Sequence, residues 1–178
     1  MKGDFTRNTY FPAQQYSRVL MQQGRVQLDA DWNEQTAIVL HYLRALTRDI
    51  LGPQVGPADD CGFEIVTAAT IGRLVDLEAD PTRRGVLQSE VKQGNFAIGP
   101  GRYYVDGFAV ENARVVLYSE QVGYPFAGSA TVEGLNAGTA GLVYLEVWEA
   151  LVTPVQDDHM REVALGGPDT CLRAQVAW

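Results

Sequence analysis

One segment of this sequence, residues 31–51, carries a helix pattern that any fold of the chain has to accommodate. Asp31, followed three residues later by Glu34, matches a capping box, in which the two side chains satisfy free backbone N–H groups of the first turn. Gly52 and Pro53 match a helix end, because glycine adopts positive φ easily and proline cannot continue a helix. The pattern predicts an α-helix over residues 31–51.

The apolar residues of this helix form a stripe with spacings of 4, 3, 4, 3 and 4 residues. Its members are Trp32, Thr36, Val39, Leu43, Leu46 and Ile50, and the apolar face is widened by Ile38, Tyr42 and Ala45. Two hypotheses fit this pattern. The helix docks on a sheet of its own chain, or it joins a short bundle between subunits, since two apolar flanks can contact two partners. About three heptads are too few to separate the two hypotheses.

Residues 1–30 are polar and aromatic, and their apolar residues are spaced too unevenly for a helix. Pro12 favours extended backbone at the residue before it. We expect an arm that lays its aromatic side chains either on its own chain or on a neighbouring subunit. The candidate partner-binding residues of the arm and the helix are Phe5, Tyr10, Phe11, Tyr16, Leu20, Met21, Arg25, Trp32, Val39, Leu43, Leu46 and Ile50.

After a linker rich in Gly, Pro and Asp at residues 53–62, the chain reads mainly as strands. The turns Gly99-Pro100-Gly101 and Asp106-Gly107 predict that the strands on either side of each turn pair with one another. Residues 70–92 are ambiguous, with a turn at Asp80-Pro81. Alternation along residues 142–152 predicts a strand with one buried and one partly solvated face. The other candidate strands are 63–66, 95–98, 102–105, 108–110, 114–118, 130–132 and 172–178.

The fold class that we expect is α+β, mainly β. An N-terminal arm and one amphipathic helix (residues 1–52) serve assembly or attachment, and residues 53–62 form a linker. Residues 63–178 form an antiparallel module like a β-sandwich or barrel. Because the sequence ends within a strand pattern, we expect the natural chain to continue after Trp178.

Charge and hydropathy exclude some classes of function. The chain has 14 basic and 22 acidic residues, a net charge of −8, which disfavours binding to phosphate-rich nucleic acid. The first residues, MKGDFTRNTYFP, lack the apolar core of a signal peptide. The longest apolar stretch, 142–152, is interrupted by Glu146 and Glu149, so we expect no membrane insertion. We therefore expect assembly in the cytoplasm, with no signal peptide.

No pattern of catalytic residues is convincing, and we expect no enzyme, cofactor or metal site. Cys61 and Cys171 lack the spacing of metal ligands and predict two free, partly buried thiols, with a disulfide as the alternative. Two weaker hypotheses stay open. A hydrolase would use Asp157, Asp158, Glu162 and His159, and a glycan-binding module would stack sugars on Tyr103, Tyr104 and Trp148.

Two segments resemble a family of bacterial proteins that occur beside contractile injection systems, the phage-tail-like particles. The first combines the start MKGDFTR with MQQGRVQLDADWNEQ at residues 21–35, and the second is LVYLEVWEALVTPVQDDHMREVALGGPDTCLRAQVAW at 142–178. NFAIGPGRYYVDGFAVEN at 95–112 also resembles strand-turn-strand modules of phage baseplate and tail-fibre proteins.

The resemblance implies a structural component of such a particle, at the baseplate or anchoring an outer fibre, spike or cage. The partners would be other baseplate or appendage subunits. A homo-oligomer is expected, with a trimer favoured, in a particle that stays in the cytoplasm or is released. The alternatives are the glycan-binding module of a tail-fibre-type protein and the hydrolase described above.

Overall fold

The computed structural model describes residues 3–121 and 141–178, which group into two compact units. Unit 1 comprises Met1–Gln54, Val105–Phe108 and Glu146–Trp178, and unit 2 comprises Val55–Tyr104 and Ala109–Leu145. The described residues form three α-helices and eight short strands in small sheets, none of which closes into a barrel. The predicted α+β class is confirmed. The candidate strand at 130–132 lies outside the described residues.

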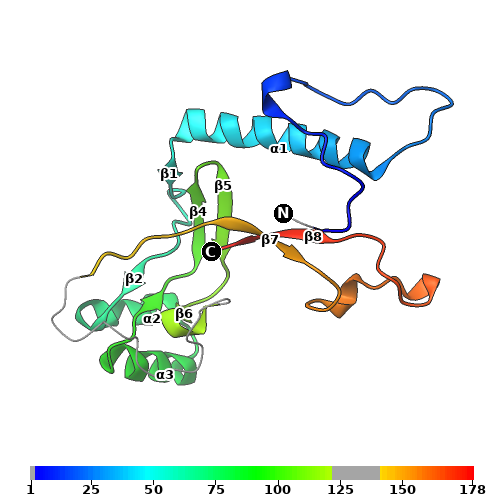
Figure 1. Cartoon of the computed structure of the whole chain (residues 1–178). Helices are drawn as coiled ribbons and strands as arrows, with labels where there is room; N and C mark the ends of the chain where they lie inside the picture. Colours follow the sequence, from blue (N-terminus) through cyan, green and yellow to red (C-terminus); the bar gives the residue numbers. More distant parts are fainter. Residues whose placement is uncertain (1–2, 122–140) are drawn as a thin grey trace. The chain divides into compact units, whose positions relative to one another are not determined.

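The helix predicted over residues 31–51 is present in unit 1 as α1 (Asp29–Leu51), with its N-terminal half beside the arm (Figure 1). It begins two residues earlier than expected, and Leu28 is its N-cap. The predicted role of Asp31 as the N-cap is therefore wrong: its carboxylate accepts the N–H of Leu28 at 3.2 Å from the third helical position. The predicted end is confirmed, since Gly52 has φ 90° and donates its N–H to the carbonyl of Arg48.

The arm is irregular, as predicted, with one short 3₁₀ turn, η1 (Pro12–Gln14), between residues 3 and 28. The other secondary structure of unit 1 is an antiparallel ribbon of β7 (Trp148–Val152) and β8 (Arg173–Ala177), in which Trp148 pairs with Ala177 and Val152 with Arg173. Two 3₁₀ turns lie between these strands, η4 (Asp158–Met160) and η5 (Val163–Leu165).

The strand predicted over 142–152 is only partly correct. Residues 142–147 form no strand, and no residue of 142–152 is buried, so the expected buried face is absent. A two-stranded ribbon explains this difference, because it needs a further layer to bury one of its faces.

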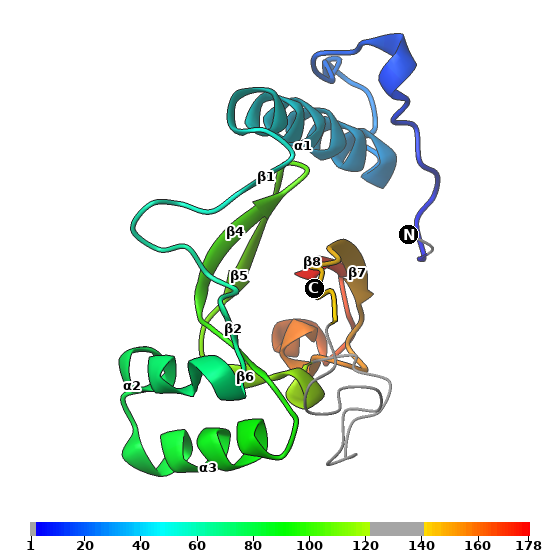
Figure 2. The ribbon, with the colours of Figure 1, turned by 90° about the vertical axis from the view of Figure 1, so that its left-hand side faces the viewer.

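Unit 2 contains a compact core between a small sheet and two helices. The sheet has the order β2 (Ile65–Val66), β3 (Ala97–Ile98), β6 (Val116–Leu117), and is antiparallel throughout. Helices α2 (Leu74–Leu77) and α3 (Pro81–Lys92) lie side by side below it (Figure 2), with 3₁₀ segments η2 (Ala68–Arg73) and η3 (Tyr118–Glu120) at its edges. The core residues are Val66, Leu74, Leu87, Val91, Ala97, Val115 and Leu117.

The ambiguous stretch 70–92 is thus mostly helical. Asp80 is the N-cap of α3 and accepts the N–H of Thr82 at 2.9 Å, and Pro81 occupies the first helical position. This pair is a known helix start, because proline lacks only an N–H that would be unpaired there anyway. We interpreted the same two residues as a turn.

A hairpin of β4 (Gly101–Val105) and β5 (Phe108–Asn112) is confirmed at Asp106-Gly107, and β1 (Gln54–Val55) is the third strand of its sheet. Asp106 and Gly107 have φ 48° and 83°. Positive φ at both central residues gives the type I′ turn, whose twist matches that of paired strands.

The other predicted pairing, across Gly99-Pro100-Gly101, is wrong. β3 pairs with β2 and β6, whereas β4 pairs with β1 and β5, so the chain changes sheets at this turn. The turn binds residues 60–64 instead: Gly62 donates to Arg102 O at 3.0 Å, and Gly99 donates to Glu64 O at 2.8 Å. A Cβ on Gly62 would lie 2.4 Å from the carbonyl carbon of Gly101, so this crossing requires glycine.

Candidate interaction surface

The arm is attached to the start of α1 by polar groups. Thr6 donates both its N–H, at 2.9 Å, and its hydroxyl to the carboxylate of Asp29. These two hydrogen bonds lower the pKa of Asp29, because they stabilise its ionised form. The anionic side chain also lies in the first turn of α1, where the helix dipole favours negative charge.

Two further bonds continue this attachment along α1. The hydroxyl of Thr9 donates to Glu34, and the N–H of Val19 donates to Oε1 of Gln35 at 2.8 Å. Glu34 therefore binds the arm rather than closing the capping box that the sequence predicted. The arm is therefore held on α1 by hydrogen bonds from its backbone N–H and hydroxyl groups. Most of its aromatic side chains take no part in this attachment.

Tyr10 is the aromatic residue of the arm that packs on α1. Its ring lies 5.9 Å from the ring of His41, and its hydroxyl is covered without a hydrogen-bond partner among the described residues. The pKa of Tyr10 is raised, first by this burial and then by the nearby Tyr42. Tyr10 thus contacts its own chain, which was one of the two predicted roles of the arm.

The other eleven candidate partner-binding residues are exposed. They are Phe5, Phe11, Tyr16, Leu20, Met21, Arg25, Trp32, Val39, Leu43, Leu46 and Ile50. All of them belong to the arm or to α1, and both of these segments are in unit 1. We call these eleven residues the N-terminal surface.

Helix α1 uses two different faces. Ala30 and Ile38 are each 1% exposed. The stripe of Trp32, Thr36, Val39, Leu43, Leu46 and Ile50 is exposed along its whole length. The helix therefore does dock on its own chain, but through the flank that contains Ile38 and not through the stripe.

A clamp around Arg44 holds the packed face of α1. The guanidinium donates to Glu149 of β7 at 2.6 Å and lies 3.9 Å from the centre of the Phe108 ring. A Cβ at Gly107 would come within 2.4 Å of the Arg44 carbonyl oxygen, so the hairpin turn touches the helix backbone. Sequence analysis missed this clamp, because 105 residues separate Arg44 from Glu149 and no local pattern joins them.

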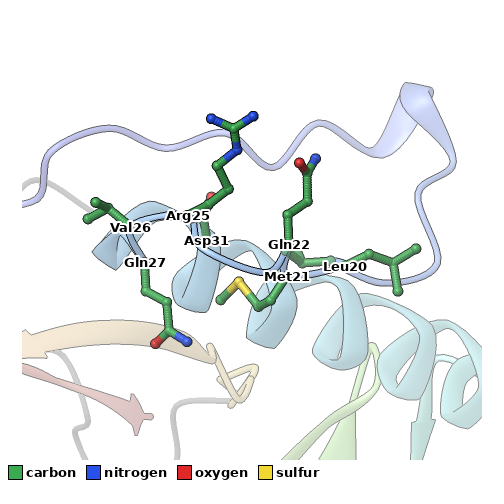
Figure 3. A pocket seen from close by; sticks show the side chains of 8 residues that line it. Leu20, Met21, Gln22, Arg25, Val26, Gln27 and Asp31 are labelled. Carbon is green, nitrogen blue, oxygen red and sulfur yellow. The ribbon is translucent and has the colours of Figure 1, made fainter.

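A pocket of about 420 Å³ lies between the arm and the start of α1 (Figure 3). Met21 extends toward the helix, whereas Gln22 and Arg25 point away from it. The lining residues are Val19, Leu20, Met21, Gln22, Arg25, Val26, Gln27 and Asp31. Three of them, Leu20, Met21 and Arg25, belong to the N-terminal surface, so the pocket is a depression in that surface.

The residues of the hydrolase hypothesis do not converge. Asp157 accepts the N–H of the exposed His159 at 3.1 Å, and Glu162 accepts the N–H of Ala164 at 2.9 Å. Asp158 pairs with Arg161 at 2.6 Å. Each carboxylate therefore binds a group two or three residues away in its own turn, and the side chains do not meet at one site. Within residues 3–121 and 141–178, no group of three or more His, Cys, Asp or Glu side chains could hold a metal ion.

The two tyrosines of the glycan hypothesis do not share a face. Tyr103 and Tyr104 are neighbours on β4, so their side chains point to opposite faces of the strand. Tyr103 contacts the edge of Phe63, with ring centres 6.5 Å apart. Trp148 is 44% exposed and belongs to β7 in unit 1. The two tyrosines do not form one stacking platform.

Both cysteines are free, but they are exposed and not partly buried as predicted. Cys171 is placed next to β8, where Nη1 of Arg173 lies 2.8 Å from its sulfur. This hydrogen bond is the main reason that the pKa of Cys171 is lowered, because the cation stabilises the thiolate.

The helices of the described residues include none that is long and apolar enough to cross a membrane. No curated protein and no solved structure matches the chain. One protein family does match, and its match extends over residues 1–178. The chain therefore belongs to the Family of unknown function (DUF6519).

Proposed function

We propose that this protein is a structural component of a phage-tail-like contractile injection system, at the baseplate or anchoring an outer appendage. The proposal is supported by the resemblance of residues 21–35 and 142–178 to proteins that occur beside such systems. The observation that carries it is the N-terminal surface, whose eleven residues on the arm and α1 are all exposed among the described residues.

The amount of exposed apolar surface at the N-terminus supports a binding role. Among the described residues, 24 large apolar side chains are exposed, and 14 of them lie in residues 5–51. Monomeric soluble proteins rarely leave large contiguous apolar patches in water, because each buried square ångström contributes about 25 cal/mol. A surface of this kind is typical of a part that is covered by other subunits.

The charge distribution favours a protein partner. Residues 1–28 contain four of the 14 basic and one of the 22 acidic residues, a net charge of +3. The remainder, with ten basic and 21 acidic residues, carries −11. An arm that combines positive charge with exposed aromatic side chains suits an acidic protein surface, where aromatic and arginine side chains are the usual anchors.

The proposal is tested by locating the protein in injection-system particles purified from cells that produce both. We expect the full-length protein to co-sediment with the particles. A variant that lacks residues 1–28 should be expressed at the same level and remain in the supernatant. Val75→Asp, which changes an exposed apolar residue of unit 2, is the control and should co-sediment like the unchanged protein. Abundant expression without any co-sedimentation of the unchanged protein would contradict the proposal.

A further inference from the structure

We propose that the exposed stripe of α1 binds the same stripe of other copies of this chain, forming a short coiled coil. This inference deepens the proposed function and rests on it, because it names the partner of one part of the N-terminal surface. The stripe is defined above as Trp32, Thr36, Val39, Leu43, Leu46 and Ile50.

The spacing of the stripe indicates that its partner is a helix. Alternating steps of four and three residues average 3.5, the repeat that keeps one seam of a helix facing a second helix. In this repeat Thr36, Leu43 and Ile50 take the a positions, and the other three residues take the d positions. The stripe extends about 27 Å along α1, at 1.5 Å per residue.

The stripe is exposed among the described residues, so the described part of unit 1 does not bury it. Trp32 is 72% exposed, Leu43 is 56% exposed and Ile50 is 70% exposed. The packing of α1 on unit 1 is already provided by Ala30, Ile38 and the Arg44 clamp on the other flank. Covering the stripe with a second helix would therefore leave the Ile38 flank and the Arg44 clamp in place.

The residues that flank the stripe indicate that the partner helix is an identical one. Heterotypic coiled coils select their partners through opposite charges at the e and g positions. In α1 these positions are Asn33, Leu40, Thr47, Gln35, Tyr42 and Asp49, of which Asp49 alone is charged. Residues 29–178 carry a net charge of −11, so the acidic parts of two copies repel each other, and this nearly uncharged face lets two α1 helices approach at a low electrostatic cost.

The test compares two substitutions of equally exposed apolar residues in the full chain. Leu43→Asp places a carboxylate in the middle of the stripe, whereas Val75→Asp places one on α2, where Val75 is 59% exposed. We expect the unchanged protein and Val75→Asp to self-associate with increasing concentration in analytical ultracentrifugation. Leu43→Asp should stay monomeric, with the same circular dichroism spectrum.

A second substitution covers the case in which Leu43→Asp fails to fold. Thr36 is a polar residue at an a position, so Thr36→Ile should extend the apolar seam and lower the dissociation constant by about tenfold. An unchanged protein that stays monomeric at every concentration at which it is soluble would overturn the inference, as would equal association of Leu43→Asp and the unchanged protein.

The two proposals fail in distinguishable ways. A protein that co-sediments with particles but is monomeric alone would refute the self-association and leave the proposed function standing. A protein that self-associates through α1 but is absent from the particles would refute the proposed function.

Discussion

Helices α1 and α3 are both amphipathic, but they place their apolar residues in opposite environments. In α3, Leu87 and Val91 are four residues apart and each is 1% exposed, so the apolar face is sealed against the small sheet of unit 2. In α1, the regular stripe is exposed, and the buried residues Ala30 and Ile38 lie on another flank. The difference teaches that a clear apolar pattern marks a surface to be covered, without indicating which chain covers it.

The two units also differ in how many apolar residues they bury. Of the twelve buried apolar residues in the described part of the chain, ten belong to unit 2, and only Ala30 and Ile38 belong to unit 1. Unit 1 is held by polar contacts, such as the Arg44 clamp and the bonds from the arm to α1. We therefore expect substitutions of buried apolar residues to lower the free energy of unfolding most in unit 2. In unit 1, we expect the main effects from substitutions that remove a hydrogen bond or an ion pair.

The largest effect is expected from Leu87→Ala in the core of unit 2. Removing a side chain that is 1% exposed leaves a cavity and should lower the free energy of unfolding by about 2–5 kcal/mol. The neighbouring Val86 is 56% exposed, so Val86→Ala should change it by less than about 0.5 kcal/mol. Urea unfolding followed by circular dichroism measures both. Similar losses in the two variants would show that α3 is not packed as described.

Sequence patterns predicted the elements whose signals are local. The end of α1 is marked by Gly52, and the hairpin by Asp106-Gly107, where the residue types themselves allow the required backbone angles. Helix α3 also had a local signal, Asp80-Pro81, but a helix start and a turn use the same residue types there. The periodicity of the following residues is weakened by Gly85.

The parts that could not be predicted depend on contacts between distant residues. Nothing near Gly99-Pro100-Gly101 indicates that the chain changes sheets there, since the cause is the close approach of Gly62. The Arg44 clamp is likewise formed by Phe108 and Glu149 from two other segments. For the candidate surface, the sequence identified the stripe of α1, but only the structure shows that the stripe is exposed among the described residues.

The second largest effect is expected at the Arg44 clamp of unit 1. Arg44→Ala removes a partly buried ion pair and a cation–π contact, and should lower the free energy of unfolding by about 1–2 kcal/mol. Arg48→Ala is the matched control, because Arg48 lies one turn along the helix and reaches Asp106 only at 3.5 Å between exposed groups. Its expected change is below about 0.5 kcal/mol. A double-mutant cycle with Glu149→Gln measures the pair, and a coupling energy near zero would contradict this role.

A smaller, pH-dependent effect is expected at the attachment of the arm. The pKa of Asp29 is lowered by its bonds from Thr6, so the contribution of this contact is complete above the ordinary pKa of about 4. It is lost as the pH falls through the lower value in the folded protein. Hydrogen exchange of the Thr6 amide, corrected for the intrinsic rate, should therefore be slowed at pH 6 and nearly unprotected at pH 2.

Two carboxylates on α1 provide the controls for this pH effect. Asp29→Asn should remove most of the protection of the Thr6 amide already at pH 6, because a neutral amide accepts the two bonds more weakly. Asp49→Asn, near the other end of the helix, should leave it unchanged. If the Thr6 amide kept its protection at pH 2, the arm would be attached by something other than this carboxylate.

The smallest effect is expected from a substitution in the stripe of α1. This substitution tests whether the apolar stripe of α1, unlike the apolar face of α3, stays unpacked in the monomer. Leu46 is 57% exposed, so Leu46→Ala should change the free energy of unfolding by less than about 0.5 kcal/mol when the protein is dilute and monomeric. Alanine is also the better helix former, which offsets part of the lost contact. At high concentration the same substitution should lower the midpoint of thermal unfolding, because association stabilises only the folded chain. A loss of several kcal/mol in the dilute protein would mean that the stripe packs within its own chain, and that α1 and α3 play the same role after all.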